Sequence, residues 1–422
     1  MSDRLLALLS LACLLAITFL AGLASAYLYL APYRIAVQTW GEIKAFMKEP
    51  DRLMPVRYDF EGVRIHDANA IAPGSTLITS YFPEFDWHAG VRLIDESGAV
   101  LHSWAPDPGE IFGGRHNYPY IHGSHLFPNG DILFNFEFIG IARMSACGDV
   151  LWALSEPRAH HSISANDDGS FWVSGNQELR SRDGRDEKLL NILSFPVYED
   201  YFMKVSADGE VLKSISSIEV FEKNGLSDVY LRTGRNYHGD IFHLNDIEEL
   251  SPDMAAEYPL FDAGDIVVSL RDLHMVIVLD PETLEVKWHT YSDTLFQHDP
   301  DFIGDGWIGI FDNNYDRTEG GGLQGGSRIV AVQPHTQERA ILFPKRPDQP
   351  FYTKWSGKWQ KLPNGNLLLT ESRAGRALEV TSTGDPVWEW VMDRYDASQV
   401  PEVMEATRYP ITAEEVAAWN CP

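Results

Sequence analysis

The chain has 422 residues, more than one domain usually contains, so the sequence predicts either several domains or one large closed all-β architecture. Hydrophobic residues make up 44% of the chain, which is enough for a folded core and excludes intrinsic disorder. With 34 basic and 61 acidic side chains, the formal charge is −27, and this charge repels nucleic acids and anionic lipid surfaces. No nucleic-acid partner is therefore expected.

The first predicted element is an apolar segment near the N-terminus. No residue from Leu5 to Ala26 is charged, and the apolar character continues to Pro32. This length can span a bilayer as a helix, so we expect residues 1–32 to be a transmembrane anchor. A cleaved signal peptide is the alternative, because Ala24-Ser25-Ala26 offers a cleavage site.

The apolar segment is followed by a predicted linker, residues 33–55. Its stretch from Tyr33 to Glu49 has the pattern of a short amphipathic helix. Basic residues stand on both sides of the apolar segment, so their distribution does not define its orientation in a membrane.

The chain contains three cysteines, and Cys13 lies inside the apolar segment. Cys147 and Cys421 are either one disulfide, formed in an oxidising compartment, or two unrelated thiols. No CxxC motif or Cys/His zinc spacing occurs.

Residues 56–422 repeat one pattern of four apolar strands and Gly-containing turns, with a period of roughly 40 to 50 residues. The clearest copies run from His122 to Trp152 and from Ser356 to Trp390. This self-similarity predicts an all-β fold, a six-bladed β-propeller with four-stranded blades. The other four units align on pairs of turns: Pro73-Gly74 with Ser97-Gly98, Asp168-Gly169 with Asp208-Gly209, Ala263-Gly264 with Pro281-Glu282, and Asp305-Gly306 with Pro334-His335.

Three segments interrupt the repeat. Residues 180–200 lengthen the third unit, and residues 248–261 lengthen the first hairpin of the fourth. Residues 221–240 predict a connecting helix and a loop that carries Arg232, Arg235 and His238. Each segment either covers the channel mouth or elaborates the surface.

A histidine recurs at one position of the repeat, eight residues before the hairpin glycine. The pairs are His66 and Gly74, His122 and Gly130, His161 and Gly169, and His298 and Gly306. His243 begins the corresponding strand of the fourth unit, and Gly357 takes this place in the sixth. The innermost strands of a propeller all run in the same direction, so these five histidines are expected to share one mouth of the channel.

Hairpin geometry predicts partners for these histidines. Residues equidistant from a two-residue turn face each other across the ladder. A β-bulge would break this register. The predicted pairs are His122 with Glu137, His161 with Asn176, His298 with Asn313 and His66 with Tyr81, and Arg271 is placed near His243.

The histidines have two interpretations. They could be structural, fixing strand ends by hydrogen bonds. A cluster of imidazoles with one Arg, one Glu and two Asn is costly to leave unsatisfied, and such clusters are usually functional. His88, His116, His125, His160 and His274 break the spacing and are expected to be ordinary packed or surface residues.

Several local sequences together resemble the arylsulfotransferase family over most of the chain from His66 to Val391. The resemblance implies a six-bladed propeller that transfers sulfate between phenols, without a nucleotide donor, through a sulfated histidine. The motifs are HHSI (160–163), HLNDI (243–247), VVSLR (267–271), QHD (297–299), FDNN (311–314) and LPNGNLLLTESRAGRALEV (362–380).

Carried onto the matching positions, the resemblance makes His298 the nucleophile, with His161, His243 and Arg271 around the sulfuryl group. It implies an aryl sulfate and a phenol as small-molecule partners, with no cofactor and no metal. It also implies a body outside the cytoplasm, in the periplasm if the cell is bacterial, and held to the membrane by the N-terminal helix. The secondary candidates are Asn313, Asn176, Glu137, His122 and His66.

Two other functions remain open from the residues alone. Converging neutral histidines could hold Fe, Cu or Zn, with Glu137 as a carboxylate ligand. Alternatively, the chain could be a non-enzymatic, membrane-tethered propeller scaffold, because a fold does not define a function.

Overall fold

The computed structural model describes residues 3–28, 30, 32–33, 52–114, 116, 119–182, 184–232, 239–291, 293–318 and 320–421. The chain divides into two compact units, residues 1–51 with 115–118 and residues 52–114 with 119–422. The amphipathic helix expected from Tyr33 to Glu49 lies outside the described residues beyond Tyr33, as do Arg235 and His238.

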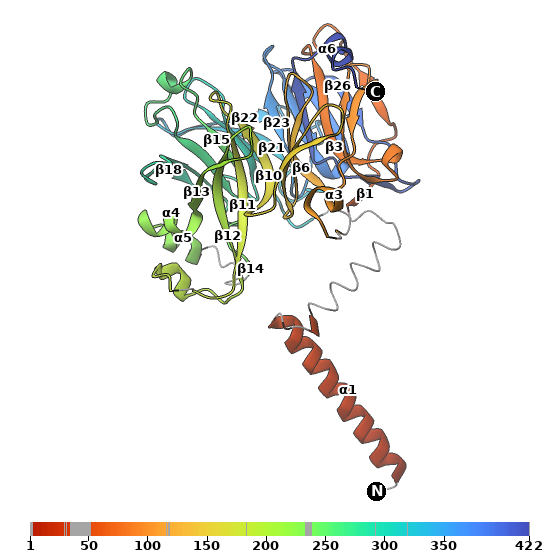
Figure 1. Ribbon diagram of the computed structural model, residues 1–422, viewed down its shortest axis with the longest axis vertical. Helices are drawn as coiled ribbons and strands as arrows, with labels where there is room; N and C mark the ends of the chain where they lie inside the picture. The colour runs from red at the N-terminus through yellow and green to blue at the C-terminus, as the bar shows by residue number, and fades with distance from the viewer. Residues whose placement is uncertain are drawn as a thin grey trace. The chain divides into compact units, whose positions relative to one another are not determined.

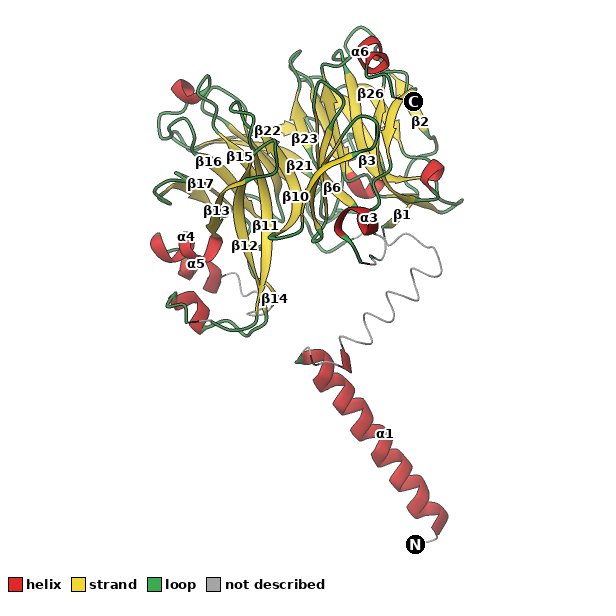
Figure 2. Ribbon diagram, in the orientation of Figure 1, coloured by secondary structure: helices red, strands yellow, loops and turns green. Residues whose placement is uncertain are grey.

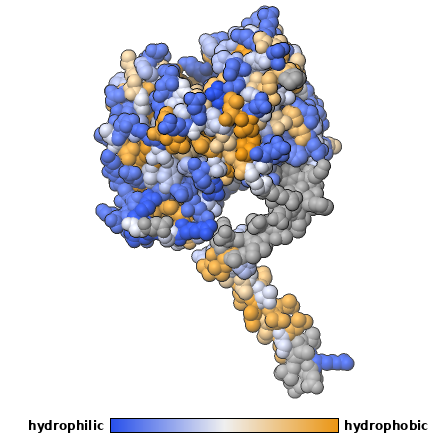
Figure 3. Space-filling view, viewed as in Figure 1, coloured by the Kyte–Doolittle hydropathy of each residue, from blue (hydrophilic) through white to orange (hydrophobic). Residues whose placement is uncertain are grey.

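In the first unit, the apolar segment forms one helix, α1 (Asp3–Tyr27). Its stretch Leu9–Tyr27 has a mean hydropathy of 2.2 and is long enough to cross a bilayer. Figure 3 shows hydrophobic side chains along α1, whereas the visible face of the second unit is largely hydrophilic. The helix suits a membrane anchor or a signal sequence.

The second unit is the expected six-bladed β-propeller with four-stranded blades (Figures 1 and 2). In blades 2 to 6 the chain runs outward from the first strand to the fourth through antiparallel hairpins. Blade 2 contains β6 (Ile121–Leu126), β7 (Ile132–Phe136), β8 (Gly140–Met144) and β9 (Val150–Leu154). Blade 3 contains β10 (Arg158–Ala165), β11 (Phe171–Leu179), β12 (Val197–Val205) and β13 (Val211–Ser216), with β14 (Gly239–Asp240) parallel to β12. Blade 4 contains β15 (Leu244–Glu249), β16 (Ile266–Leu270), β17 (Met275–Leu279) and β18 (Val286–Thr290).

The last two blades in the chain follow the same pattern. Blade 5 contains β19 (His298–Phe302), β20 (Ile308–Asp312), β21 (Arg328–Gln333) and β22 (Glu338–Phe343); blade 6 contains β23 (Trp359–Lys361), β24 (Leu367–Glu371), β25 (Arg376–Val380) and β26 (Pro386–Val391), with β2 (Gly62–Ile65) added at its outer edge.

Blade 1 is built from both ends of the propeller sequence. Its innermost strand is the C-terminal β28 (Glu405–Tyr409), followed outward by β3 (Ser75–Phe82), β4 (His88–Ile94) and β5 (Val100–Trp104). The prediction that the strand around His66 would be innermost is therefore wrong. His66 follows β2 on the outside of blade 6, because that segment pairs with β26 rather than with β3.

Six apolar clusters hold the blades together, one between each neighbouring pair. Side chains alternate between the two faces of a strand, so Ile132, Phe134 and Phe136 of β7 pack towards blade 1, whereas Leu133 packs towards blade 3. Both faces of the middle strands are thus buried. This explains why these strands are almost continuously apolar rather than alternating.

Short helices and one further strand pair complete the structure. α4 and α5 confirm the helix expected in the connecting segment, and Figure 1 shows them beside the long β11–β12 hairpin, which runs down to β14. The bounds are β1 (Leu53–Pro55) paired with β27 (Gln399–Pro401), helices α3 (Pro108–Phe112), α4 (Ser217–Lys223), α5 (Ser227–Arg232) and α6 (Ala413–Ala418), and 3₁₀ turns η1 (Pro83–Phe85), η2 (Lys188–Asn191), η3 (Ala255–Glu257), η4 (Arg271–Leu273) and η5 (Ser372–Ala374).

The two cysteines outside α1 form a disulfide, which decides between the two alternatives left open by the sequence. Cys147 lies in the turn between β8 and β9, and Cys421 follows α6, with a Cα–Cα distance of 5.1 Å. The bond therefore fixes the segment after β28 to blade 2.

We predict that replacing both bonded cysteines by Ser lowers the melting temperature of the full chain by several degrees. The disulfide limits the unfolded ensemble, and such bonds contribute about 2–4 kcal/mol. Calorimetry in detergent, with Cys13→Ser as the control, measures the effect. Equal melting temperatures for the double variant and the control would contradict it.

Candidate active site

Four inner strands share a backbone irregularity at the same mouth of the channel. A β-bulge interrupts the pairing near the start of β6, β10, β15 and β19. His161 and His243 have φ values of 56° and 54°, a left-handed conformation that non-glycine residues adopt at a cost of about 1 kcal/mol or more. Bulges re-aim side chains, and strain of this kind concentrates at functional sites.

The bulges change the register that the hairpin argument predicted. Arg158 rather than His161 pairs with Asn176, so the predicted contact of Asn176 with His161 is wrong. The predicted pairing of His66 with Tyr81 is also wrong; Nε2 of His66 instead lies 2.6 Å from Oε1 of Glu389. The side-chain contacts of His122 with Glu137 and of His298 with Asn313 persist despite the bulges.

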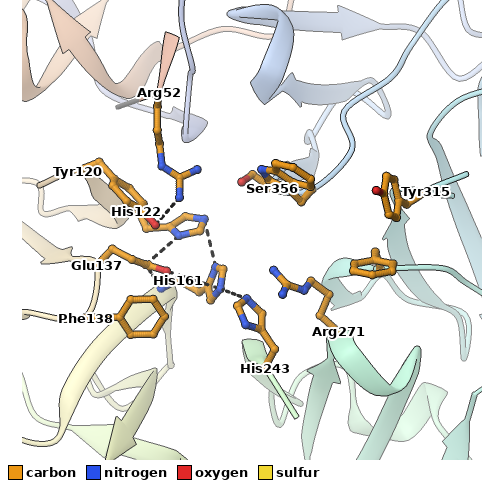
Figure 4. A pocket seen from close by; sticks show the side chains of 12 residues that line it. Arg52, Tyr120, His122, Glu137, Phe138, His161, His243, Arg271, Tyr315 and Ser356 are labelled. Carbon is orange, nitrogen blue, oxygen red and sulfur yellow. Dashed lines mark hydrogen bonds and ion pairs between the residues drawn. The ribbon is translucent and has the colours of Figure 1, made fainter. Parts of the chain in front are cut away.

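Three of the predicted histidines form one hydrogen-bonded chain with a carboxylate at each end, and Figure 4 shows it from Glu137 to His243. Glu137 Oε2 lies 2.9 Å from His122 Nδ1, and His122 Nε2 lies 3.2 Å from His161 Nδ1. His161 Nε2 lies 2.8 Å from His243 Nε2, and His243 Nδ1 is hydrogen-bonded to Asp240 Oδ2. Both ring nitrogens of all three imidazoles are therefore engaged.

The charges of this chain follow from its contacts. Burial alone would raise the pKa of Glu137, but His122 lowers it to about 2. Burial likewise opposes ionisation of Asp240, and His243 lowers the pKa of Asp240 to about 2. Burial, with the neighbouring imidazoles, holds the pKa of His161 well below its ordinary value. Both ends of the chain are therefore carboxylates, and its centre is a neutral imidazole.

His298 stands beside this chain in a different environment. Its Nδ1 lies 3.0 Å from the carbonyl oxygen of Phe296 and 2.7 Å from Oδ1 of Asn313. The Asn313 amide nitrogen donates to the carbonyl oxygens of Thr353 and Ser356, so its oxygen must face the ring. Two acceptors at Nδ1 place the proton there. Nε2 therefore carries the lone pair, and it is buried with no hydrogen-bond partner among the described residues.

The environment of His298 also keeps it uncharged. Burial and the nearby Arg271 guanidinium hold the pKa of His298 well below its ordinary value. The His161 and His298 ring centroids are 6.0 Å apart. Arg271 lies where it was predicted, since its backbone N–H donates to the carbonyl oxygen of His243 at 3.0 Å.

A cavity of about 530 Å³ opens over the histidine chain. One wall carries Tyr120 and Phe138, and another carries Phe296, Tyr315 and Trp355, whose rings form a continuous aromatic surface. His298 is not a lining residue. The lining residues are Arg52, Tyr120, His122, Glu137, Phe138, His161, His243, Arg271, Phe296, Tyr315, Trp355 and Ser356.

The aromatic lining residues were not singled out by the sequence analysis, and neither were three residues with ionisable side chains. Asp240 closes the histidine chain, and Arg52 and Tyr120 line the cavity. Arg52 hydrogen-bonds to Tyr120 and to Glu402, whose Oε2 lies 3.0 Å from Nη1. The sequence could have indicated Asp240, because it stands three residues before His243, a spacing at which a backbone turn can bring two side chains together.

His122, Glu137 and His161 are also the one group in the described part of the chain whose possible metal-ligand atoms lie within 4.8 Å of one another. In this structure those atoms are hydrogen-bonded to each other rather than directed at a common centre. Nδ1 of His122 faces Glu137, and its Nε2 faces His161. In this structure the three residues are thus joined by hydrogen bonds.

The structure is thus a six-bladed propeller with a cavity at one mouth of its channel, lined with histidines, arginines and aromatic rings. The profile of the arylsulfotransferase (ASST) family matches residues 122–393, well over half of the sequence. The chain therefore belongs to the arylsulfotransferase family, as its motifs indicated. No curated protein matches it at a significant level.

Solved structures resemble the chain only distantly. A protein of unknown function from Bacteroides caccae is 12% identical over 78% of this chain and 99% of its own, with a TM-score of 0.49. Virginiamycin B lyase from Staphylococcus aureus is 9% identical over 70% and 86%, with a TM-score of 0.37. The WD40 domain of Neurospora crassa Pan2 is 11% identical over 77% and 84%, with a TM-score of 0.39. Similarities this low carry no information about the site.

A second cavity, of about 450 Å³, is lined by residues nearer the ends of the same inner strands. Several carboxyl groups surround Lys358 there, and Lys358 Nζ lies 3.0 Å from Asp299 Oδ1. Burial and the neighbouring Asp299 raise the pKa of Asp246 to about 8. Burial also raises the pKa of Glu248 to about 8.

We predict that Asp246→Asn stabilises the propeller increasingly as the pH rises. An unfolded Asp loses its proton near pH 4, roughly its reference pKa, whereas the folded one keeps it up to about pH 8, so the free energy of unfolding falls across this window. The variant lacks this loss. Melting temperatures from pH 5 to 8 should diverge between variant and parent. Asp385→Asn, a control at an exposed position, should run parallel to the parent; parallel curves for Asp246→Asn would refute the assignment.

Proposed function

We propose that this protein transfers a sulfuryl group from an aryl sulfate ester to a phenol through a sulfated His298. The observation that carries the proposal is the fixed tautomer of His298. Its Nδ1 proton is held by Phe296 and Asn313, which leaves the Nε2 lone pair without a partner among the described residues. A neutral imidazole with a free lone pair is a nucleophile near neutral pH.

The transfer proceeds in two displacements. In the first, the Nε2 lone pair attacks sulfur, the S–N bond forms, and the S–O bond to the aryl group breaks with its electron pair on the phenolate oxygen. In the second, a phenol oxygen attacks the same sulfur and frees His298. Nε2 is covered in this structure, so donor binding must move a neighbouring side chain aside.

The residues around the cavity suit the charges of this reaction. Arg271 extends towards His161 and His243 (Figure 4), where its positive charge would stabilise the sulfuryl oxygens. His161 and His243 could protonate the departing phenolate and later deprotonate the acceptor phenol. The aromatic wall formed by Phe296, Tyr315 and Trp355 offers a surface on which an aryl ring can stack.

We also propose that the propeller works outside the cytoplasm, in the periplasm if the cell is bacterial, tethered by α1. The Cys147–Cys421 disulfide supports this placement, because disulfides persist in oxidising compartments. The apolar stretch Leu9–Tyr27 supports the tether.

We predict that incubation with 4-nitrophenyl sulfate adds the mass of one sulfuryl group to the full chain, located on His298. His298→Asn should abolish the adduct and lower phenol sulfation by at least about 10³-fold, because the nucleophile is lost. Mass spectrometry of intact protein and peptides measures it. His66→Asn, a histidine outside the cavity, should retain the adduct.

Two results would favour the other functions. A stoichiometric transition metal that is lost with His161→Asn or His243→Asn would favour a metal enzyme. Absence of any adduct or product with a broad panel of aryl sulfates would favour a tethered scaffold.

A further inference from the structure

The hydrogen-bonded chain Glu137–His122–His161–His243–Asp240 has an acceptor at each end. Oε2 of Glu137 also accepts the backbone N–H of His161 at 3.0 Å, and Oδ1 of Asp240 accepts that of His243 at 3.1 Å. An ionised carboxylate has no proton to give. All protons in the chain must therefore come from the imidazoles.

The number of protons in the chain follows from its hydrogen bonds. Five groups in a row make four bonds, and each bond contains one proton. Three neutral imidazoles supply three. We infer that the chain holds one additional proton, so that one imidazolium is shared between His122 and His243 while His161 remains neutral.

Three arrangements satisfy all four bonds, and the one in which His161 is the imidazolium is disfavoured because burial and the neighbouring imidazoles lower its pKa. Two arrangements remain. In one, His243 is the imidazolium, and it donates to both Asp240 and His161. In the other, His122 is the imidazolium, and it donates to both Glu137 and His161. Moving one proton between His122 and His161, and another between His161 and His243, interconverts them. Central His161 thus relays the charge without becoming charged itself, as its lowered pKa requires.

The groups packed around the chain do not change this count. Arg271 is paired with Asp272, and Arg52 is paired with Glu402. The His160 ring packs against the chain, with its centroid 5.1 Å from that of His161, but its Nε2 faces Asp200 Oδ1 at 3.5 Å rather than a member of the chain. Burial opposes ionisation of His160, whereas Asp200 raises its pKa, so its proton is counted separately. Tyr120, whose pKa is raised by burial and Glu137, stays protonated, and His298 is neutral.

The same count allows only one additional proton in the chain. A chain with two carboxylates and one imidazolium has a net charge of −1. With a second additional proton, two N–H groups of the chain would point at each other. Without the additional proton, two nitrogen lone pairs would point at each other, or one would point at a carboxylate oxygen.

The stored proton has a role if the proposed function holds. When the S–O bond breaks, the phenolate oxygen takes this proton and leaves as a neutral phenol, and the chain charge changes from −1 to −2. When the acceptor phenol attacks, its proton returns to the chain, so no proton is gained or lost over the cycle. Glu137 and Asp240 are then positioning residues, because they act only through the imidazoles.

Asp240→Asn tests the count directly. The amide N–H that this substitution introduces can donate to Nδ1 of His243 and supply the fourth proton from a group that does not release it. We expect residue-assigned, histidine-selective ¹⁵N NMR of the full chain at pH 7.5 to show one imidazolium among His122, His161 and His243 in the parent and none among these three in the variant. Glu137→Gln is no substitute, because the Oε2 that faces His122 also accepts the backbone N–H of His161. If Asp240→Asn does not fold, the parent spectrum alone tests the count. Three neutral rings in the parent would overturn the inference.

The kinetic consequence separates proton delivery from mere structure. Phenyl sulfate releases a basic phenolate and needs the proton, whereas 4-nitrophenyl sulfate releases a stable one. Asp240→Asn should lower turnover of phenyl sulfate by about 10²-fold or more, and that of 4-nitrophenyl sulfate by less than about 10-fold. An equal loss for both donors would show a structural role and overturn proton delivery.

The matched control is Glu389→Gln, which alters the carboxylate of the His66–Glu389 pair outside the cavity. Glu389→Gln should leave unchanged both the imidazolium signal of the histidine chain and the ratio of the turnover rates of phenyl sulfate and 4-nitrophenyl sulfate. A change in either would refute the assignment of these effects to Asp240. An imidazolium in a parent protein that sulfates no phenol would support the proton count and refute the proposed function, so the two can fail separately.

Discussion

The pairing of β28 with β3 closes the ring of blades, and the rest of the propeller unit depends on that closure. Each of the six apolar clusters lies between two blades, so no blade has a complete core by itself. Closure also removes the open edge that β3 would otherwise present. The six inner strands are then held parallel around one channel. Only in that arrangement do the starts of β6, β10, β15 and β19 meet at one mouth.

Because the inner strands converge at this mouth, the imidazoles of the site are buried, in a protein with a formal charge of −27. Burial lowers the proton affinity of His161 and His298, whereas the carboxylates of Glu137 and Asp240 counteract this effect at the two ends of the histidine chain. The same elements thus produce two kinds of histidine a few ångströms apart. One has a free lone pair, and the others share protons. A transfer reaction with a nucleophile and a proton donor needs both kinds.

Much of this arrangement could be predicted from the sequence, and the failures have physical causes. The spacing of histidine and glycine found His122, His161 and His298, because inner strands start at a fixed distance from their hairpins. It failed for His66, since that segment pairs with β26 and the C-terminal β28 takes the inner position of blade 1. A local repeat gives no indication that two strands far apart in the sequence pair with each other.

Register was the second limit. A bulge inserts residues that no periodic pattern reveals, so Asn176 pairs with Arg158 instead of His161, whereas Glu137 and Asn313 keep their contacts with His122 and His298. Arg52 and Tyr120 reach the site from the segments just before β1 and β6, and Asp240 reaches it from β14, outside the inner strands. Their positions depend on tertiary packing, which sequence spacing does not encode.

The position of β28 in the sequence also determines when the molecule can become complete. A chain is made from its N-terminus, so blades 2 to 6 can assemble while blade 1 still lacks its inner strand, and the ring stays open until β28 has been synthesised. The four strands at whose starts the histidines lie belong to consecutive blades, 2 to 5, and need not wait for that event. A nascent protein would therefore already carry its reactive cluster while still exposing an unpaired edge. Folding factors that shield such edges would be needed most during this interval.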